Sequence, residues 1–276
     1  LLIYDAINKI LIKNHIKAPK LYTQNLKKNF MEIEDFGQIT LFKYLSKNKK
    51  KKFKNYQLII HLLNQIQSIK DRKIKNFNNK YYKIPEYKKK ILFNETKLFC
   101  NWYAPNILPK KNIKKFNEIF KRQIKLLLKK IKLKNNMFVH RDFHVSNIMM
   151  KEKKLALIDS QDALVGNRAY DLASLIDDVR FESSQNFKEK IYNYYLKTNY
   201  KKFNKKNFRN DFEILSVLRN LKIIGIFSRL AKRDKKNYYL KLIPYAWKLI
   251  SLRVDKNPML YDLKKNLKKN FLNELK

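Results

Sequence analysis

Apolar residues recur three and four positions apart along most of the chain, and this spacing predicts amphipathic helices with one buried face. One clear stripe lies in residues 56–69 and comprises Leu58, Ile59, Leu62, Leu63, Ile66 and Ile69. The helices predicted in this way span residues 2–14, 40–46, 56–69, 86–102, 112–132, 168–180, 188–196, 212–230, 238–252 and 260–275.

Short apolar segments interrupt the helical pattern and predict strands. Residues 147–150 and 155–158 are apolar and flank the charged turn Lys151–Lys154, an arrangement typical of a β-hairpin. Strands are also predicted at residues 19–23, at 30–34, where apolar and polar residues alternate, and at 138–139. The polar residues 71–83 predict a loop, and Gly166-Asn167 suits a turn.

The polar segment between the strand at 138–139 and the hairpin carries the candidate chemistry. It contains His140-Arg-Asp142, four further residues and then Asn147, and Asp159 follows the second hairpin strand. This spacing matches a phosphotransferase catalytic loop, in which the Asp is the base and the Asn binds magnesium. Magnesium prefers oxygen ligands and takes one or two protein carboxylates plus substrate phosphates. The alternative, three unrelated polar residues on a surface loop, is disfavoured by the apolar strands on both sides.

Four segments give the chain a family resemblance: His140-Arg-Asp-Phe-His-Val-Ser-Asn147, Ile158-Asp-Ser-Gln-Asp-Ala163, Gly166–Leu175 and Leu92–Tyr103. They resemble the aminoglycoside phosphotransferase and choline kinase group, and within it the bacterial kinases of N-acetylmuramate and N-acetylglucosamine. Where protein kinases have Asp-Phe-Gly, this chain has Asp159-Ser-Gln, which argues against a protein substrate.

The resemblance implies an α+β, protein-kinase-like fold, as in aminoglycoside phosphotransferases. A truncated small N-lobe would span residues 1–37, and a mainly helical C-lobe would span residues 38–276. The implied activity is transfer from ATP, with magnesium, to a small-molecule hydroxyl, chiefly the anomeric hydroxyl of an amino sugar in cell-wall recycling. Asp142 would be the base, and Asn147 and Asp159 would hold magnesium. Two alternatives stay open: a module fused to or partnering the tRNA threonylcarbamoylation ATPase, and an inactive binding protein.

Further site residues follow from the resemblance or from their places in the predicted loops and helices. Glu34, Asp35 and Phe36 are candidates for the hinge that bonds the adenine edge; a plain strand-to-helix turn at Gly37 is the alternative. His140 and Arg141 are expected to be supports, and Asp171 to stabilise a helix start and tie down the catalytic loop. The remaining candidates each have two interpretations. His144 either orients the phosphate or the acceptor, or braces the loop. Asp162 either holds the acceptor or a second metal, or caps the loop. Trp102 and Tyr103 either stack on a sugar ring or pack in the core.

Glycine content bears on the phosphate-binding loop. The chain has 3 glycines, far apart in sequence, so a glycine-rich phosphate cradle cannot be built from them. The chain starts at Leu1, and we expect the first strands of the N-lobe to be missing and activity of this stretch alone to be low.

The charge bears on whether the protein binds nucleic acid, and the cysteine content bears on its cellular compartment. The formal net charge is +41, but the lysines are spread along the whole chain, which favours compositional drift over a nucleic-acid footprint. The single cysteine, Cys100, cannot form an internal disulfide, which is consistent with a cytoplasmic protein. Its apolar neighbours indicate a packing residue. No apolar run is long enough to span a membrane.

Overall fold

The computed structural model describes residues 1–48, 51–151, 154–200 and 202–275. The chain folds into two compact units. The first comprises residues 1–87, 134–176 and 183–200, and the second comprises residues 88–133, 177–182 and 201–276. The lobe boundary expected at residue 37 stays a prediction. Within the described ranges, no helix combines the length and the apolar character needed to cross a bilayer.

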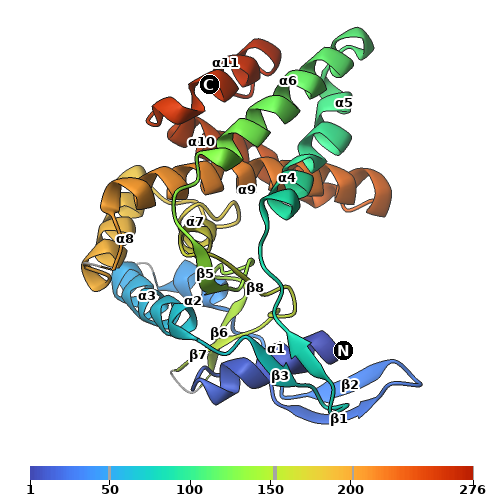
Figure 1. Ribbon diagram of the computed structural model, residues 1–276, viewed down its shortest axis with the longest axis vertical. Coiled ribbons are helices and arrows are strands. Elements are labelled where there is room, and N and C mark those ends of the chain that lie inside the picture. The colour runs from blue at the N-terminus through green and yellow to red at the C-terminus, as the bar shows by residue number, and fades with distance from the viewer. Residues whose placement is uncertain (49–50, 152–153, 201, 276) are drawn as a thin grey trace. The chain divides into compact units, whose positions relative to one another are not determined.

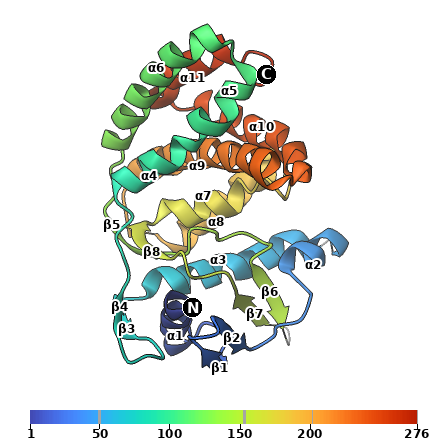
Figure 2. The ribbon, with the colours of Figure 1, turned by 90° about the vertical axis from the view of Figure 1, so that its right-hand side faces the viewer.

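The first unit combines small antiparallel sheets with helices (Figures 1 and 2). Among its described residues, four strand pairs form: β1 with β2, β3 with β4, β5 with β8, and β6 with β7. Its elements are α1 (Leu2–Lys13), β1 (Leu21–Asn25), β2 (Phe30–Ile33), α2 (Leu41–Lys47), α3 (Lys52–Ser68), β3 (Lys73–Lys75), β4 (Tyr81–Lys83), β5 (Asn135–Val139), β6 (Ile148–Lys151), β7 (Lys154–Leu157), β8 (Leu164–Asn167), α7 (Ala169–Ile176) and α8 (Gln185–Thr198).

The predicted helices of this unit form and bury the faces that their spacing indicates. In α1, Ala6, Ile7 and Ile10 are fully buried. In α3 the predicted stripe is buried except for Leu58, which is 47% exposed. The prediction is wrong at Leu58 because this residue lies between two buried turns of the helix, Asn55–Tyr56 and Ile59–Ile60, and points to the exposed side. The helix also starts earlier than predicted, at Lys52.

Two predictions of irregular structure in this unit are wrong. Residues 71–83 contain the β3–β4 hairpin, in which Ile74 pairs with Tyr82. Its strands are only three residues long and mostly exposed, so no apolar pattern marks them. Gly166 lies in β8 opposite Met137 of β5, rather than in a turn. A Cβ on Gly166 would lie 3.1 Å from a Val139 methyl carbon and 3.2 Å from the Tyr87 Cβ, so close packing explains this glycine.

The β6–β7 hairpin confirms the prediction made from the two apolar segments. Ile148 pairs with Leu157, and Lys151 pairs with Lys154. Residues 152–153 of the predicted charged turn lie outside the described residues, as do residues 49–50. The inner ends of both hairpin strands are buried, and the catalytic loop enters the hairpin at this end.

The second unit is helical in its described part (Figure 1). Residues 86–102 do not form the single helix predicted for them. The α-helix ends at Thr96, and the single-turn π-helix Phe99–Tyr103, called the π-turn below, follows it. The elements are α4 (Lys89–Thr96), the π-helix Phe99–Tyr103, α5 (Ala104–Ile107), α6 (Lys110–Lys129), α9 (Lys205–Asp234), the 3-10 helix Asn237–Leu242, α10 (Ile243–Val254), the 3-10 helix Pro258–Leu260 and α11 (Tyr261–Asn270).

An aromatic cluster forms the core of this unit. Phe99 stacks on Phe120 with ring centroids 5.5 Å apart and meets Trp247 edge-on at 5.7 Å. Tyr103 is buried in the same cluster, and its hydroxyl accepts a hydrogen bond of 3.1 Å from the Trp247 indole nitrogen. Cys100 is also buried, and burial raises the pKa of its thiol to about 12. The thiol therefore stays protonated at neutral pH, which confirms the packing interpretation.

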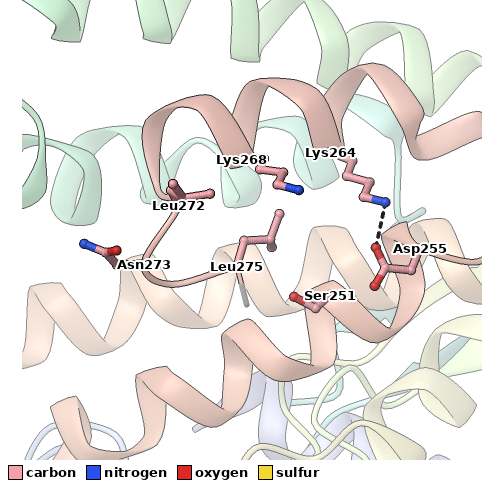
Figure 3. Close-up of a pocket in the computed structure, with 7 residues that line it drawn as sticks. All are labelled: Ser251, Asp255, Lys264, Lys268, Leu272, Asn273 and Leu275. Atoms are coloured by element: carbon pink, nitrogen blue, oxygen red, sulfur yellow. Dashed lines mark ion pairs between the residues drawn. The ribbon is translucent and has the colours of Figure 1, made fainter.

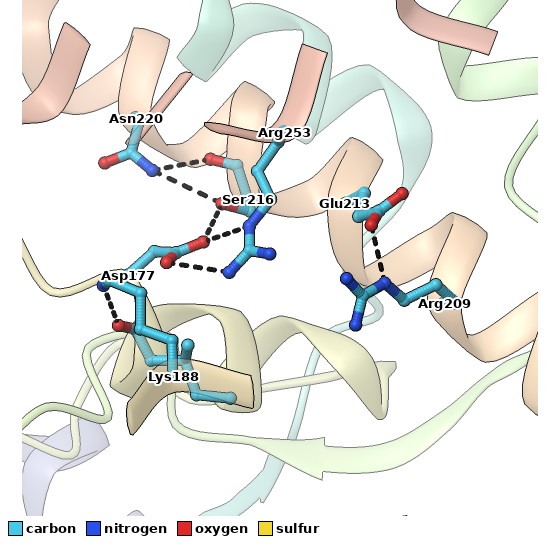
Figure 4. A network of polar contacts seen from close by, with 8 residues as sticks. Asp177, Lys188, Arg209, Glu213, Ser216, Asn220 and Arg253 are labelled. Atoms are coloured by element: carbon cyan, nitrogen blue, oxygen red, sulfur yellow. Dashed lines mark hydrogen bonds and ion pairs between the residues drawn. The ribbon is translucent and has the colours of Figure 1, made fainter. Parts of the chain in front are cut away.

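A buried ion pair ties α10 to the segment after α7 (Figure 4). The Arg253 guanidinium donates to both carboxylate oxygens of Asp177, at 2.8 and 3.0 Å, and the Ser216 hydroxyl donates to the same carboxylate at 2.6 Å. Both charged side chains are almost completely buried. Bidentate pairing satisfies the two charges together, so removal of one partner would take this pairing from a buried charge and would be destabilising.

Candidate active site

The predicted catalytic loop connects the end of β5 to the start of β6, within the first unit. Phe138 and Val139 are fully buried and anchor its beginning, and Ile148 anchors its end. Between them, Asp142 and Asn147 are half-buried, whereas Asp159, just beyond β7, is exposed. The apolar strands thus fix the backbone, and the polar residues project from their ends.

Asn147 lies between the predicted base, Asp142, and the other predicted metal ligand, Asp159. Its side-chain nitrogen donates to the backbone oxygen of Asp142 at 3.1 Å and lies 3.4 Å from a carboxylate oxygen of Asp159. The backbone of Asn147 accepts a hydrogen bond of 3.1 Å from the amide of Ile158, next to Asp159. The structure therefore brings Asp142, Asn147 and Asp159 together, as the spacing predicts.

The donor set fits a magnesium ion. Because the Asn147 amide nitrogen is engaged by the loop, the amide oxygen is the atom left for a cation, beside the exposed carboxylate of Asp159. Among the described residues, no group of three or more His, Cys, Asp or Glu side chains is arranged to hold a metal ion. One amide and one carboxylate instead suit a hard cation that takes its other ligands from water and substrate phosphates.

Two residues of the site have left-handed backbone conformations. Arg141 has φ = 74° and Asp159 has φ = 62°, values that residues other than glycine adopt only where their surroundings hold them. At Arg141 the restraint comes from Asp171, which is fully buried at the start of α7. Its carboxylate accepts hydrogen bonds from the backbone amides of His140 at 2.7 Å and Arg141 at 3.0 Å. These two hydrogen bonds tie the catalytic loop to α7, which is the role predicted for Asp171.

His140 lies under the loop rather than in the open site. It is fully buried, and its Nε2 lies 3.1 Å from the backbone oxygen of Ile158. Its Nδ1 is buried and has no hydrogen-bond partner in the described structure. Burial lowers the pKa of the imidazole, although Asp142 and Asp159 act in the opposite direction. A neutral His140 connects the catalytic loop to Ile158, the residue before Asp159, and this agrees with the supporting role predicted for it.

Arg141 and Asp162 form an outer contact of the loop. The Arg141 guanidinium donates to the backbone oxygen of Asp162 at 3.2 Å and lies 3.5 Å from its carboxylate. The guanidinium also lies over the ring of Tyr87. Asp162 is exposed, and His144 is buried inside the loop. These positions favour a bracing role for His144, while either role proposed for Asp162 stays a prediction.

The predicted hinge residues follow β2 and contact the hairpin. Phe36 is buried against Met149 and Ala156. The Lys151 ammonium donates to the backbone oxygen of Asp35 at 2.8 Å and lies 3.7 Å from the Glu34 carboxylate. Asp35 accepts a hydrogen bond from the Gly37 amide at 2.7 Å, which closes the turn. The hinge residues therefore lie beside the β6–β7 hairpin, and their contact with adenine stays a prediction.

The aromatic candidates lie in the second unit. Trp102 is half-buried on the π-turn, and its stacking on a sugar stays a prediction. For Tyr103, 5% exposed, the core interpretation is the one the structure favours.

A pocket of about 570 Å³ lies between α10 and α11 in the second unit (Figure 3). Its lining includes the Lys264–Asp255 ion pair at 2.9 Å and none of the predicted site residues.

Two contacts of the site escaped sequence reasoning. Ser160, which directly follows Asp159, is fully buried and bonds to Asn8 of α1. Lys151 lies beside the hinge, although the sequence indicates only a charged turn for it. Each pairs residues more than a hundred positions apart. In the sequence, a polar residue among the apolar residues of a predicted helix, as Asn8 is, could have marked the first contact.

Comparison with known proteins identifies the class. The profile of the phosphotransferase enzyme family matches residues 11–204, which is more than half of the chain, and the protein belongs to this family. Two relatives are named N-acetylmuramate/N-acetylglucosamine kinase. The Neisseria meningitidis relative is 32% identical over 168 residues, covering 58% of this chain and 50% of its own length. The Pseudomonas aeruginosa relative is 26% identical over 253 residues, covering 90% of this chain and 72% of its own length.

Solved structures of the same fold confirm the predicted fold class. The choline kinase LicA of Streptococcus pneumoniae, solved in complex with AMP, superposes with a TM-score of 0.56. Its sequence is 16% identical, and the match covers 89% of this chain and 76% of that chain. The protein therefore has the α+β, protein-kinase-like fold of choline kinases and aminoglycoside phosphotransferases.

Proposed function

We propose that the protein transfers the terminal phosphoryl group of ATP to the anomeric hydroxyl of N-acetylmuramate or N-acetylglucosamine. The phosphotransferase family and the kinase relatives support phosphoryl transfer, and the names of those relatives support the amino-sugar acceptor. The chain matches half of the Neisseria relative, so the activity proposed here is that of the whole natural protein. The observation that carries the proposal is the convergence of Asp142, Asn147 and Asp159.

Each residue has a stated role in this proposal. Asp142 accepts the proton of the sugar hydroxyl as the phosphoryl group moves to the sugar oxygen. Asn147 and Asp159 would hold magnesium, whose positive charge offsets the charge on the phosphate oxygens. Asp171 and His140 hold the loop that carries Asp142, through the two backbone amides and the Ile158 oxygen. Catalysis of this kind depends mainly on position and charge, and a rigid loop supplies the position.

Product formation by the full-length natural protein tests the proposal. We expect phosphorylation of one or both sugars with ATP and magnesium, and we expect the product to release phosphate in mild acid, as an anomeric phosphate does. Asp142→Asn should lower kcat by about 10²–10⁴-fold, the usual contribution of a general base. Asp262→Asn, which removes an exposed carboxylate at the start of α11, is the matched control and should leave kcat unchanged.

Two results would count against the proposal. Phosphorylation of choline or an aminoglycoside alone would refute the amino-sugar acceptor and retain the reaction class. Unchanged kcat in a folded Asp142→Asn variant would refute the role of Asp142. The association with a tRNA-modification ATPase and the cytoplasmic location stay predictions.

A further inference from the structure

A buried polar contact connects α1 to the segment that carries Asp159. The Ser160 hydroxyl donates to the side-chain oxygen of Asn8 at 2.5 Å. The side-chain nitrogen of Asn8 donates to the backbone oxygen of Pro19 at 3.1 Å. Asn8 is 3% exposed and Ser160 is fully buried. One amide thus joins three segments: α1, the approach to β1 and the turn after β7.

The position of Ser160 gives this contact its importance. Ser160 directly follows Asp159, whose left-handed conformation costs free energy and persists only where neighbouring groups hold it. The backbone oxygen of Ser160 accepts a hydrogen bond of 3.0 Å from the Ala163 amide, so Ser160 is held at its side chain and at its carbonyl. The Asp159 carboxylate itself is exposed and accepts hydrogen bonds from Gln161 at 2.8 Å and Asn147 at 3.4 Å.

The approach to β1 is part of the same arrangement. Lys17 pairs with Ala156 of β7, and the Leu157 amide donates to the Lys17 oxygen at 2.8 Å. The chain from α1 to β1 therefore runs along β7 just before Asp159. Asn8 closes this arrangement by holding both the far end of that segment, at Pro19, and Ser160. The two bonds need a donor and an acceptor on the same side chain, and the asparagine amide supplies both.

We propose that Asn8 is a positioning residue that acts through Ser160 to hold Asp159 in the conformation that binds the metal ion. This inference rests on the proposed function, because it takes Asp159 as a magnesium ligand. Loss of the Asn8 amide leaves the Ser160 hydroxyl buried without that acceptor, and the turn relaxes to satisfy it. Because a displacement of about 1 Å in a catalytic group costs on the order of 10²-fold in rate, a small movement is sufficient.

A double-mutant cycle on the full-length protein tests the inference. Mn²⁺ affinity in the presence of ATP is measured by electron paramagnetic resonance for the wild type, Asn8→Ala, Ser160→Ala and the double variant. We expect each single variant to weaken Mn²⁺ binding about tenfold, and the double variant to be no weaker than the weaker single one, because both changes remove the same contact. The KM for the acceptor should stay unchanged while kcat falls.

Asn14→Ala is the matched control. Asn14 ends the same helix, and its amide donates to the Ile10 oxygen and to Asp71, away from Ser160. We expect this variant to lose thermal stability and to keep the wild-type Mn²⁺ affinity. If Asn8→Ala behaves in the same way, or if the effects of Asn8→Ala and Ser160→Ala add, Asn8 only stabilises the fold and the inference is wrong.

The metal readout separates this inference from the proposed acceptor. A wild type that binds Mn²⁺, loses it on Asp159→Asn and phosphorylates neither sugar would refute the acceptor alone, and the Asn8 cycle would still decide the inference. Mn²⁺ affinity unaffected by Asp159→Asn would overturn the inference together with the metal site.

Discussion

Arg141 and Asp159 are the strained residues of the candidate site, and buried polar side chains next to them supply the restraint. Asp171 bonds the backbone on one side of the loop, and the Asn8–Ser160 contact fixes the residue after Asp159 on the other. Both anchors are buried, where a hydrogen bond is not weakened by competing water. The catalytic groups are thus partly open to solvent, while the atoms that position them are not.

His140 predicts how stability depends on pH. Its pKa is lowered in the folded protein by burial, so below the unfolded value of about 6.5 the unfolded chain binds a proton that the folded chain does not. We therefore expect the free energy of unfolding to fall as the pH is lowered from about 6.5 towards about 5, by up to about 1.4 kcal/mol per unit. Urea titrations across this range measure it.

His140→Asn provides the comparison for the pH prediction, because its side chain does not titrate. The variant should lose stability at neutral pH, and its disadvantage relative to the wild type should shrink as the pH falls. A disadvantage that is constant with pH would show that His140 does not cause the pH dependence.

At the scale of elements, the contact between α9 and the π-turn shows how a glycine permits close helix packing. A Cβ on Gly225 would lie 2.3 Å from the backbone carbon of Leu98 and 2.5 Å from its oxygen. Neither backbone atom can move without shifting the π-turn that carries Phe99 and the aromatic core. The π-turn itself was not predicted, because its one extra residue per turn leaves the apolar pattern of residues 86–102 helical.

Gly225→Ala tests this contact, and the sign of the effect is informative. In a helix without neighbours the change would stabilise by about 1 kcal/mol, because alanine is the better helix former. Against the Leu98 backbone we expect a net destabilisation of about 1–3 kcal/mol, the usual cost of overpacking. Chemical denaturation measures it. Gly166→Ala meets side-chain atoms at 3.1–3.3 Å and should cost less; an equal or larger loss there would contradict the role assigned to the Leu98 backbone.

At the scale of the whole molecule, the large positive charge is the property least connected to the site. The net charge is +41, and the lysines lie on strands, helices and loops alike. Several contact aromatic rings, as Lys52 does with Phe187 at 4.5 Å and Lys190 with Phe53 at 4.2 Å. These pairs join α3 and α8, and they show that some of the excess charge contributes to packing.

The charge leads to a prediction about nucleic acids. If the excess lysine is compositional drift, binding to duplex DNA and tRNA should be weak and should disappear as salt rises, because only counterion release drives it. Fluorescence anisotropy with both ligands, from low to moderate ionic strength, measures this. Nanomolar binding that persists at moderate salt would contradict the prediction and would point to a built nucleic-acid surface.

The sequence by itself determined most of the helices, the β6–β7 hairpin and the grouping of Asp142, Asn147 and Asp159. These features are local: they depend on residue spacing within about twenty positions, which periodicity and motifs reveal. It also identified Asp171 as an anchor, because an acid in the first turn of a helix has a local reason to be there.

Tertiary structure alone decided the features that join distant segments. The pairing of β8 with β5, the contact of Gly225 with Leu98 and the bond between Asn8 and Ser160 each depend on how remote parts of the chain pack. Such contacts leave little trace in a single sequence, because a strand of four residues such as β8 has almost no pattern and one buried amide has many potential partners. The chemistry of this site is therefore determined locally, while its precision depends on packing.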